Sequence, residues 1–96
     1  MAIRLVVRVT ARPGTGSELG AACKTRCAEA LKEEGCEEFE VFQSLVDPDT
    51  LLILERWADE RALAEHARLN RSRPPLRPDL RLGAGAREDY VYNRTR

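Results

Sequence analysis

The apolar residues of this chain repeat with two different periods, and the order of those periods limits the folds open to it. Residues 3–10 alternate strictly, with Ile3, Leu5 and Val7 on one side of the chain. This period of two predicts a strand with one fully apolar face. Residues 17–34 repeat at steps of three and four, which predicts a helix.

The predicted helix has recognisable ends. Thr15 and Glu18 have the spacing of a capping box, and Gly35 is placed to end the helix. Its apolar stripe consists of Leu19, Ala22, Cys23, Cys27, Ala30 and Leu31. The charged residues expected to face water are Lys24, Glu29, Lys32 and Glu33.

Two further strands are predicted at residues 38–46 and 50–57. They are joined by Asp-Pro-Asp at residues 47–49, which suits a tight turn and cannot lie in a central strand. The pair is therefore predicted to form a β-hairpin.

A second helix is expected at residues 60–70, with Asp59 as its N-cap. Its inner stripe is Ala62, Leu63, His66 and Ala67. The proline-rich segment 71–82 indicates a loop with at most one helical turn, and residues 87–94 indicate a last strand.

The order strand, helix, strand, strand, helix, strand predicts an α+β fold with ferredoxin-like βαββαβ topology. Right-handed connections then give a four-stranded antiparallel sheet with both helices on one face. A chain of 96 residues has room for one core, so we expect a single domain over residues 1–96.

Both faces of this sheet carry apolar residues. One side holds Leu5, Val7, Val41, Ile53, Trp57 and Val91. The other side holds Val6, Phe42, Val46, Leu52, Leu54, Tyr90 and Tyr92. Two helices cover only one face, so we expect the open face to form a homodimer, with Arg4, Arg8, Glu40 and Arg56 pairing across or around it. The alternative is a monomer with an apolar sheet face.

The formal net charge is zero, so no overall field attracts nucleic acid or a membrane surface. The charge is nevertheless uneven, because residues 61–96 hold nine arginines and four acidic residues. One interpretation is a solvated basic face. The other is a basic rim that attracts an anionic substrate.

No segment has the length of a membrane span or the pattern of a signal peptide, so a cytoplasmic location is expected. Cys23, Cys27 and Cys36 are interpreted as small apolar fillers in a reducing compartment. The sequence predicts no metal site, and residues 13–16 lack the spacing of a phosphate-binding loop.

Several short strings resemble the antibiotic biosynthesis monooxygenase (quinol monooxygenase-like) family. They are ARPG at residues 11–14, EGC at 34–36, DP at 47–48 and LERW at 54–57, followed by Asp59, Leu63 and His66. The resemblance implies a dimeric α/β barrel of two ferredoxin-like protomers, each with a cavity between sheet and helices. It also implies oxygenation of phenols, anthrones or quinols by dioxygen without metal, flavin or other cofactor. A heme-degrading branch shares the fold.

The candidate catalytic residues are Trp57 and His66. Trp57 would form a wall against which an aromatic substrate stacks, or else be a core residue. His66 would accept a phenolic proton, or else be a core histidine held by Glu55. Phe39 and Ile53 are further candidates for substrate binding, together with Trp57 and Glu55.

A second group lies on the last predicted strand. Tyr90, Tyr92 and Arg94 are candidates for either the cavity or the dimer seam, and the parity of their positions favours the seam.

Two departures from the family pattern bear on function. Some polyketide-oxidising members have asparagine where this chain has Ile53, and the heme-degrading branch uses an asparagine that residues 3–10 lack. The first hypothesis is a cofactor-independent monooxygenase acting on a small aromatic, quinol or polyketide-like substrate. The alternatives are a dimer that binds an aromatic or lipophilic ligand without turnover and, less favoured, heme binding or degradation.

Overall fold

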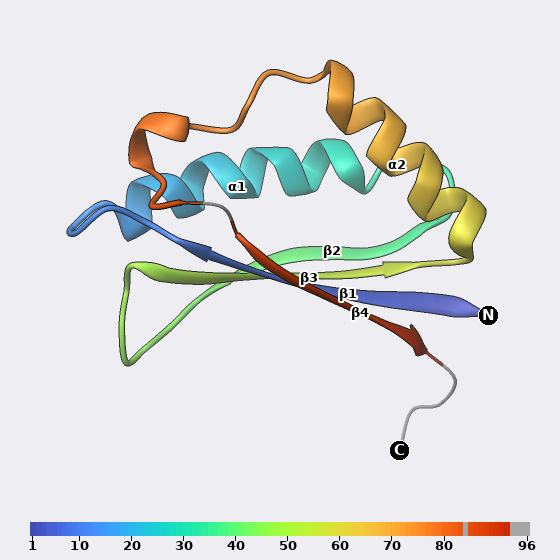
Figure 1. The fold of residues 1–96 in the computed structure, drawn as a ribbon, viewed down its shortest axis with the longest axis horizontal. Helices are drawn as coiled ribbons and strands as arrows, with labels where there is room; N and C mark the ends of the chain where they lie inside the picture. Colours follow the sequence, from blue (N-terminus) through green and yellow to red (C-terminus); the bar gives the residue numbers. More distant parts are fainter. Residues whose placement is uncertain (84, 93–96) are drawn as a thin grey trace.

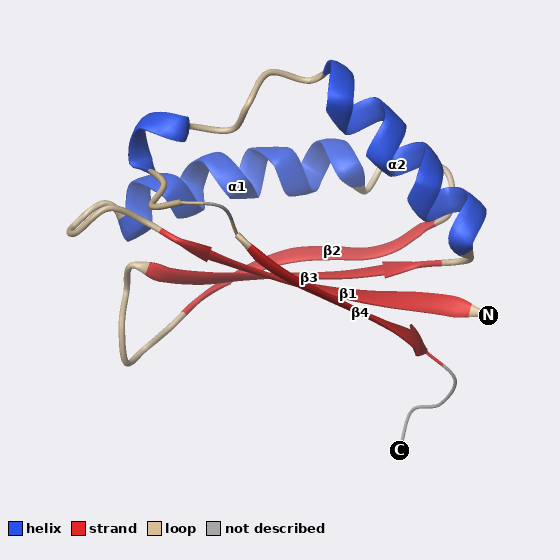
Figure 2. Cartoon of the chain, in the orientation of Figure 1, coloured by secondary structure: helices blue, strands red, loops and turns tan. Residues whose placement is uncertain are grey.

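The computed structural model describes residues 1–83 and 85–92. Its elements are β1 (Ala2–Thr10), α1 (Gly16–Ala30), β2 (Cys36–Gln43), β3 (Thr50–Trp57), α2 (Glu60–Ser72), the 3-10 turn η1 (Pro78–Leu80) and β4 (Ala86–Tyr92). The strands form one antiparallel sheet in the order β2-β3-β1-β4. Both helices lie on the same side of it (Figures 1 and 2). The predicted ferredoxin-like topology is confirmed, and the sheet is open, ending at β2 and β4.

The central strand β1 follows its predicted alternation. Ile3, Leu5, Val7 and Val9 are 4–8% exposed and face the helices. Leu5 lies opposite Glu55 and Val7 lies opposite Ile53, so the inward side of β3 is fixed by pairing with β1. Residues that lie opposite each other on paired strands point to the same side of the sheet. This register therefore places Glu55 and Ile53 under the helices.

The predicted capping box at the start of α1 is wrong. The Thr15 side chain makes no cap bond to the helix; its hydroxyl donates to the carbonyl of Arg12 at 2.7 Å. The backbone N–H groups of Gly14 and Gly16 instead donate to the two oxygens of Asp49, at 2.9 Å each. A carboxylate from the β2–β3 turn therefore performs the role that the sequence assigned to Thr15.

The end of α1 also differs from the prediction. The helix stops at Ala30, so Leu31 leaves the apolar stripe and is 51% exposed. Gly35 does not terminate the helix but lies in the turn into β2 with φ +81°, where a Cβ atom would be 2.5 Å from Cβ of Ala62. Only glycine fits this close approach to α2 without strain.

The hairpin and α2 are confirmed with small shifts. β2 ends at Gln43, and Leu45 and Val46 lie fully exposed in the connecting turn. The Asp59 carboxylate accepts from the N–H of Ala62 at 2.8 Å, as an N-cap should. The proline-rich segment contains the single short turn η1. Arg94, at the end of the predicted last strand, lies outside the described residues.

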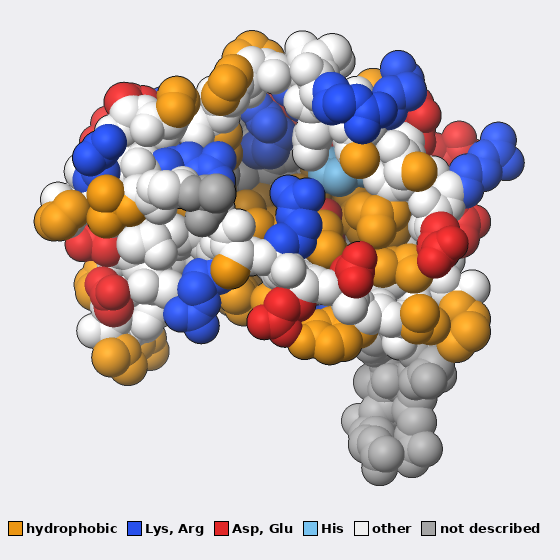
Figure 3. All heavy atoms as spheres, in the orientation of Figure 1, with side chains coloured by type: hydrophobic (Ala, Val, Ile, Leu, Met, Phe, Trp, Pro, Cys, Tyr) orange, Lys and Arg blue, Asp and Glu red, His pale blue; other side chains and the backbone are white. Residues whose placement is uncertain are grey.

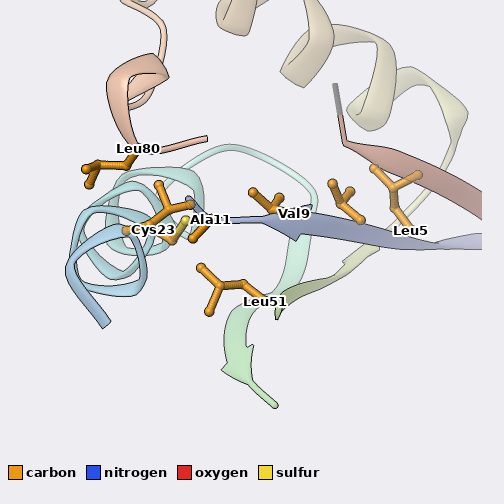
Figure 4. Close-up of a cluster of buried hydrophobic side chains, with 8 residues drawn as sticks. Leu5, Val9, Ala11, Cys23, Leu51 and Leu80 are labelled. Atoms are coloured by element: carbon orange, nitrogen blue, oxygen red, sulfur yellow. The ribbon is translucent and has the colours of Figure 1, made fainter. Parts of the chain in front are cut away.

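Two clusters of buried side chains fill the space under the helices. The β1 cluster comprises Leu5, Val7, Val9, Ala11, Leu19, Cys23, Leu51 and Leu80 (Figure 4). The Trp57 cluster comprises Cys27, Ala30, Phe39 and Trp57. Cys23 and Cys27 thus pack as core residues, and Cys23, Cys27 and Cys36 are all free thiols.

The outer sheet face remains uncovered in the protomer. Phe42 and Tyr90 are 43% and 53% exposed there, and Val6, Leu52 and Leu54 are half-buried. Arg4 and Arg56, expected to pair across or around this face, form ion pairs within the protomer, with Glu38 and Glu37 respectively. Among the described helices, none is long and apolar enough to cross a membrane.

Candidate functional site

A cavity of about 620 Å³ lies between the inner sheet face, α1, α2 and the segment that follows α2. The hollow opens on the face shown in Figure 3, where hydrophobic and basic side chains gather around it. Its apolar lining includes Leu5, Val7, Val9, Leu19, Phe39, Ile53, Leu63 and Leu76. Its polar lining includes Arg26, Glu55, His66, Asn70, Arg71, Arg73, Arg81 and Arg87. This volume suits an organic molecule of several rings.

His66 projects from α2 to the cavity wall and is 5% exposed. Its Nδ1 lies 2.9 Å from Oε1 of Glu33, and its Nε2 lies 3.0 Å from Nδ2 of Asn70. Glu55 is 3.9 Å from Nε2, beyond hydrogen-bond distance. The carboxylate that holds the imidazole is therefore Glu33 and not Glu55, contrary to the sequence-based interpretation.

These contacts define which nitrogen carries the proton. The Glu33 carboxylate is ion-paired with Arg73 at 2.9 Å and can only accept, so the Nδ1–H of His66 donates to it. Burial lowers the pKa of His66, opposed by the hydrogen bond to Glu33. The ring is consequently neutral near pH 7, and its Nε2 lone pair accepts from the Asn70 amide.

Glu55 reaches the same wall from β3 and is 3% exposed. Burial raises its pKa to about 7, while the hydrogen bond from Trp57 and the charge of Arg87 oppose this rise. The indole Nε1–H of Trp57 donates to Oε1 of Glu55 at 2.9 Å. A carboxyl with a pKa in this range exchanges protons near neutrality, beside an imidazole that accepts them.

Trp57 is fully buried and does not line the cavity. Its ring centroid lies 4.4 Å from that of His66 with the planes tilted by 33°, and it meets Phe39 edge-on at 6.3 Å. The structure therefore places the indole behind His66 and not as a wall exposed to a ligand. Its N–H group is already occupied by Glu55.

The other candidates divide between cavity and sheet face. Phe39, Ile53 and Glu55 line the cavity together with His66. Tyr90 pairs with Arg4, on the outer side of the sheet, as parity predicted. The side chain of Tyr92 and the whole of Arg94 lie outside the described part of the structure.

Sequence reasoning missed Glu33 and Asn70. Glu33 was expected to face water, yet its side chain is 8% exposed. The reason is that α1 ends at Ala30, so the helical phase that placed Glu33 outside no longer applies. Asn70 lies four residues after His66 on α2, a spacing that puts both on one face and could have identified it.

The basic rim considered from the sequence is partly present. Of the nine arginines in residues 61–96, Arg71, Arg73, Arg81 and Arg87 line the cavity, and Arg26 joins them from α1. Within residues 1–83 and 85–92, no three His, Cys, Asp or Glu side chains are placed to hold one metal ion.

Comparison with known proteins places the chain among relatives of the same architecture. The family model described as antibiotic biosynthesis monooxygenase matches residues 2–73. A conserved protein from Methanosarcina mazei is 33% identical, with a TM-score of 0.83 over 97% of this chain and 94% of that one. A conserved protein of unknown function from Bacteroides thetaiotaomicron is 27% identical, with a TM-score of 0.77 over 95% and 97%.

More distant structures extend the comparison. A protein from Mycobacterium tuberculosis is 22% identical, with a TM-score of 0.80 over 99% of this chain and 98% of that one. At this identity the likeness concerns the fold alone. None of the curated proteins compared with the chain matches it.

Proposed function

This chain belongs to the antibiotic biosynthesis monooxygenase family, and from that membership we propose that it oxidises a small aromatic, quinol-type substrate with dioxygen and without a cofactor. The observation that carries the proposal is the neutral His66 held by Glu33, with its Nε2 lone pair on the side of Asn70 and Glu55. Those two residues line the cavity, whereas Glu33 does not.

The first step is proton transfer from a substrate hydroxyl to Nε2 of His66. The hydroxyl takes the place of the Asn70 amide as the donor to Nε2, within hydrogen-bond distance. As the ring gains charge, the Glu33 carboxylate at Nδ1 stabilises the imidazolium and keeps its orientation. Arg73 in turn holds Glu33.

Deprotonation makes a quinol a better reductant, so that it can pass an electron to dioxygen directly. Radical recombination then forms the new carbon–oxygen bond. A quinol and dioxygen give a hydroxylated quinone and water, and the substrate supplies the electrons that reduce the second oxygen atom. The enzyme must bind the ring, remove the proton and exclude water.

The remaining residues have supporting roles in this proposal. Phe39 and Ile53 contact the ring of the substrate from the apolar lining. Trp57 acts as a positioning residue, because its indole packs on His66 and its N–H group fixes Glu55. Glu55 is near enough to the imidazole to receive or return a proton through a bound hydroxyl.

Activity is tested by measuring oxygen uptake with quinols and anthrones. His66→Ala should reduce kcat by roughly 10²- to 10⁴-fold, the usual contribution of a positioned base. Arg68→Gln is the matched control, because Arg68 lies on the same helix, pairs with Glu65 and does not line the cavity. An unchanged rate in His66→Ala would remove the base assignment.

The alternative of binding without turnover is favoured by one observation, the apolar Ile53 in the cavity wall. Trp57 is the only tryptophan and packs on His66, so its fluorescence reports on the site. Fluorescence quenching by a quinol without oxygen uptake would select this alternative.

We further propose that the protein is a homodimer through its open sheet face. The exposed Phe42 and Tyr90 and the half-buried Leu52 and Leu54 support this, because monomers rarely leave a contiguous apolar face in water. The wild type should therefore have twice the protomer mass in light scattering after size exclusion.

A charge on the open face should separate the protomers. Leu54→Glu should halve the measured mass, since Leu54 lies at the middle of that face opposite Val6. Leu31→Glu is the control, because Leu31 is exposed at the end of α1 and away from the sheet. A wild type that remains a monomer in dilute solution would exclude the dimer.

A further inference from the structure

Two buried guanidinium nitrogens that belong to the cavity lining have no hydrogen-bond partner among the described residues. They are Nε of Arg26, on α1, and Nε of Arg81, directly after η1. Arg26 uses Nη2 to donate to the carbonyl of Pro74 at 3.2 Å, and its Nε is 3.7 Å from Oε2 of Glu29. Buried polar groups are nearly always satisfied, so an orphaned donor in a cavity indicates a missing acceptor.

The charge around the cavity points to an anionic acceptor. Five arginines line the cavity, and Glu55 is the only carboxylate among the described lining residues. Arg73 is neutralised by Glu33. The Arg81 guanidinium makes no ion pair within the described chain, so its charge is uncompensated and a ligand anion would be strongly favoured there.

Arg26 and Arg81 both act on Cys23, which also lines the cavity. Both guanidiniums lower the pKa of the Cys23 thiol, although burial raises it overall. Arg81 forms a β-bridge with Ala11, beyond Val9 on β1, whereas Glu55 pairs with Leu5 toward the other end of the strand. Arg81 and the His66 end are therefore separated along an apolar floor, and Arg26 borders that floor from α1.

We propose that the cavity binds an aromatic carboxylate, with the carboxylate held between Arg26 and Arg81 and the ring lying on the floor toward His66. The inference rests on the proposed function, because it names the class of substrate for the same site. An inorganic anion is far smaller than a cavity of about 620 Å³ and would leave the apolar floor without a contact. A ring-bearing acid satisfies the orphaned donors and the apolar surface together.

The test compares a non-oxidisable acid with its neutral isostere by isothermal titration calorimetry. 2-Naphthoate should bind the wild-type protein at least about tenfold more tightly than 2-naphthamide. Arg81→Gln and Arg26→Gln should each reduce this preference, and the double variant should abolish it. Arg68→Gln removes the same charge from the surface and should retain the full preference.

Three results would overturn the proposal. One is equal affinity of the wild type for acid and amide, a comparison that requires no variant to fold. Another is a preference that survives in the folded double variant. The third is acetate binding as tightly as 2-naphthoate. Because these ligands are not oxidised, the outcome is independent of oxygen uptake, so a failure here is distinct from a failure of the proposed activity.

Discussion

The space between helices and sheet has two ends that differ in packing. At the closed end, Trp57 and Ala30 are fully buried and do not line the cavity. At the open end, Val7 and Val9 pack with Leu19 and Cys23 of α1 and also line the cavity. The same sheet face thus provides a rigid support at one end and room for a ligand at the other.

His66 and Glu55 lie where the two ends meet. Each contacts the closed end, through ring packing on Trp57 or through the indole hydrogen bond, and each also lines the cavity. The well-packed end therefore holds the groups proposed to move protons in place, while the same groups line the cavity at the other end.

Removing the centre of the closed end should have the largest effect. Trp57→Ala should lower the free energy of unfolding by about 3–5 kcal/mol, because it opens a cavity in a packed cluster. Urea unfolding measures this loss. Trp57→Phe keeps most of the ring volume and should lose clearly less; similar losses in the two variants would contradict the packing explanation.

At the boundary, Glu55→Gln should change how stability depends on pH. The pKa of Glu55 is about 7 in the folded protein and near its ordinary value of 4.5 in the unfolded chain. The folded state therefore binds the proton more tightly. The contribution of Glu55 is most favourable below pH 4.5 and is lost as pH rises to 7, by about 3 kcal/mol.

Glutamine is uncharged throughout this range and can still accept from the Trp57 indole. The variant should thus gain stability relative to the wild type between pH 5 and pH 8, as measured by urea midpoints at both values. His66 has the opposite dependence, since its lowered pKa reduces stability as pH falls below 6.5, but it is present in both proteins and cancels. Parallel pH curves would show that Glu55 is not protonated in the fold.

The open end should give the smallest effect. Leu76 is half-buried and packs on the β1 cluster at the cavity edge, so Leu76→Ala should cost about 1 kcal/mol. The same urea experiment provides the value. If this loss equalled that of Trp57→Ala, the two ends would not differ in packing.

The sequence predicted the elements whose signals are local. Alternation placed Ile3 to Val9 inward, and Asp59 was correctly identified as a cap, because each depends on neighbouring residues along one element. His66 and Glu55 could be placed under the helices because strand pairing and helix periodicity determine which side they face.

What the sequence could not predict depends on contacts between distant segments. The partner of the α1 N-terminus is Asp49 of the hairpin turn, a long way from Thr15 in sequence. Glu33 turned inward because α1 stopped early, and Trp57 lies behind His66 because Glu55 holds its N–H group. Such outcomes follow from tertiary packing, which overrides a local pattern.

In the absence of a ligand, the Asn70 amide already donates to the Nε2 lone pair of His66. A hydroxyl arriving there exchanges one hydrogen bond for another, so the number of bonds at the ring is conserved and that contact adds little net affinity. Discrimination in binding must then come from the rest of the ligand, through the fit of its carbon skeleton to the floor and its anionic group at Arg26 and Arg81, whereas His66 distinguishes hydroxylated ligands mainly by their reactivity.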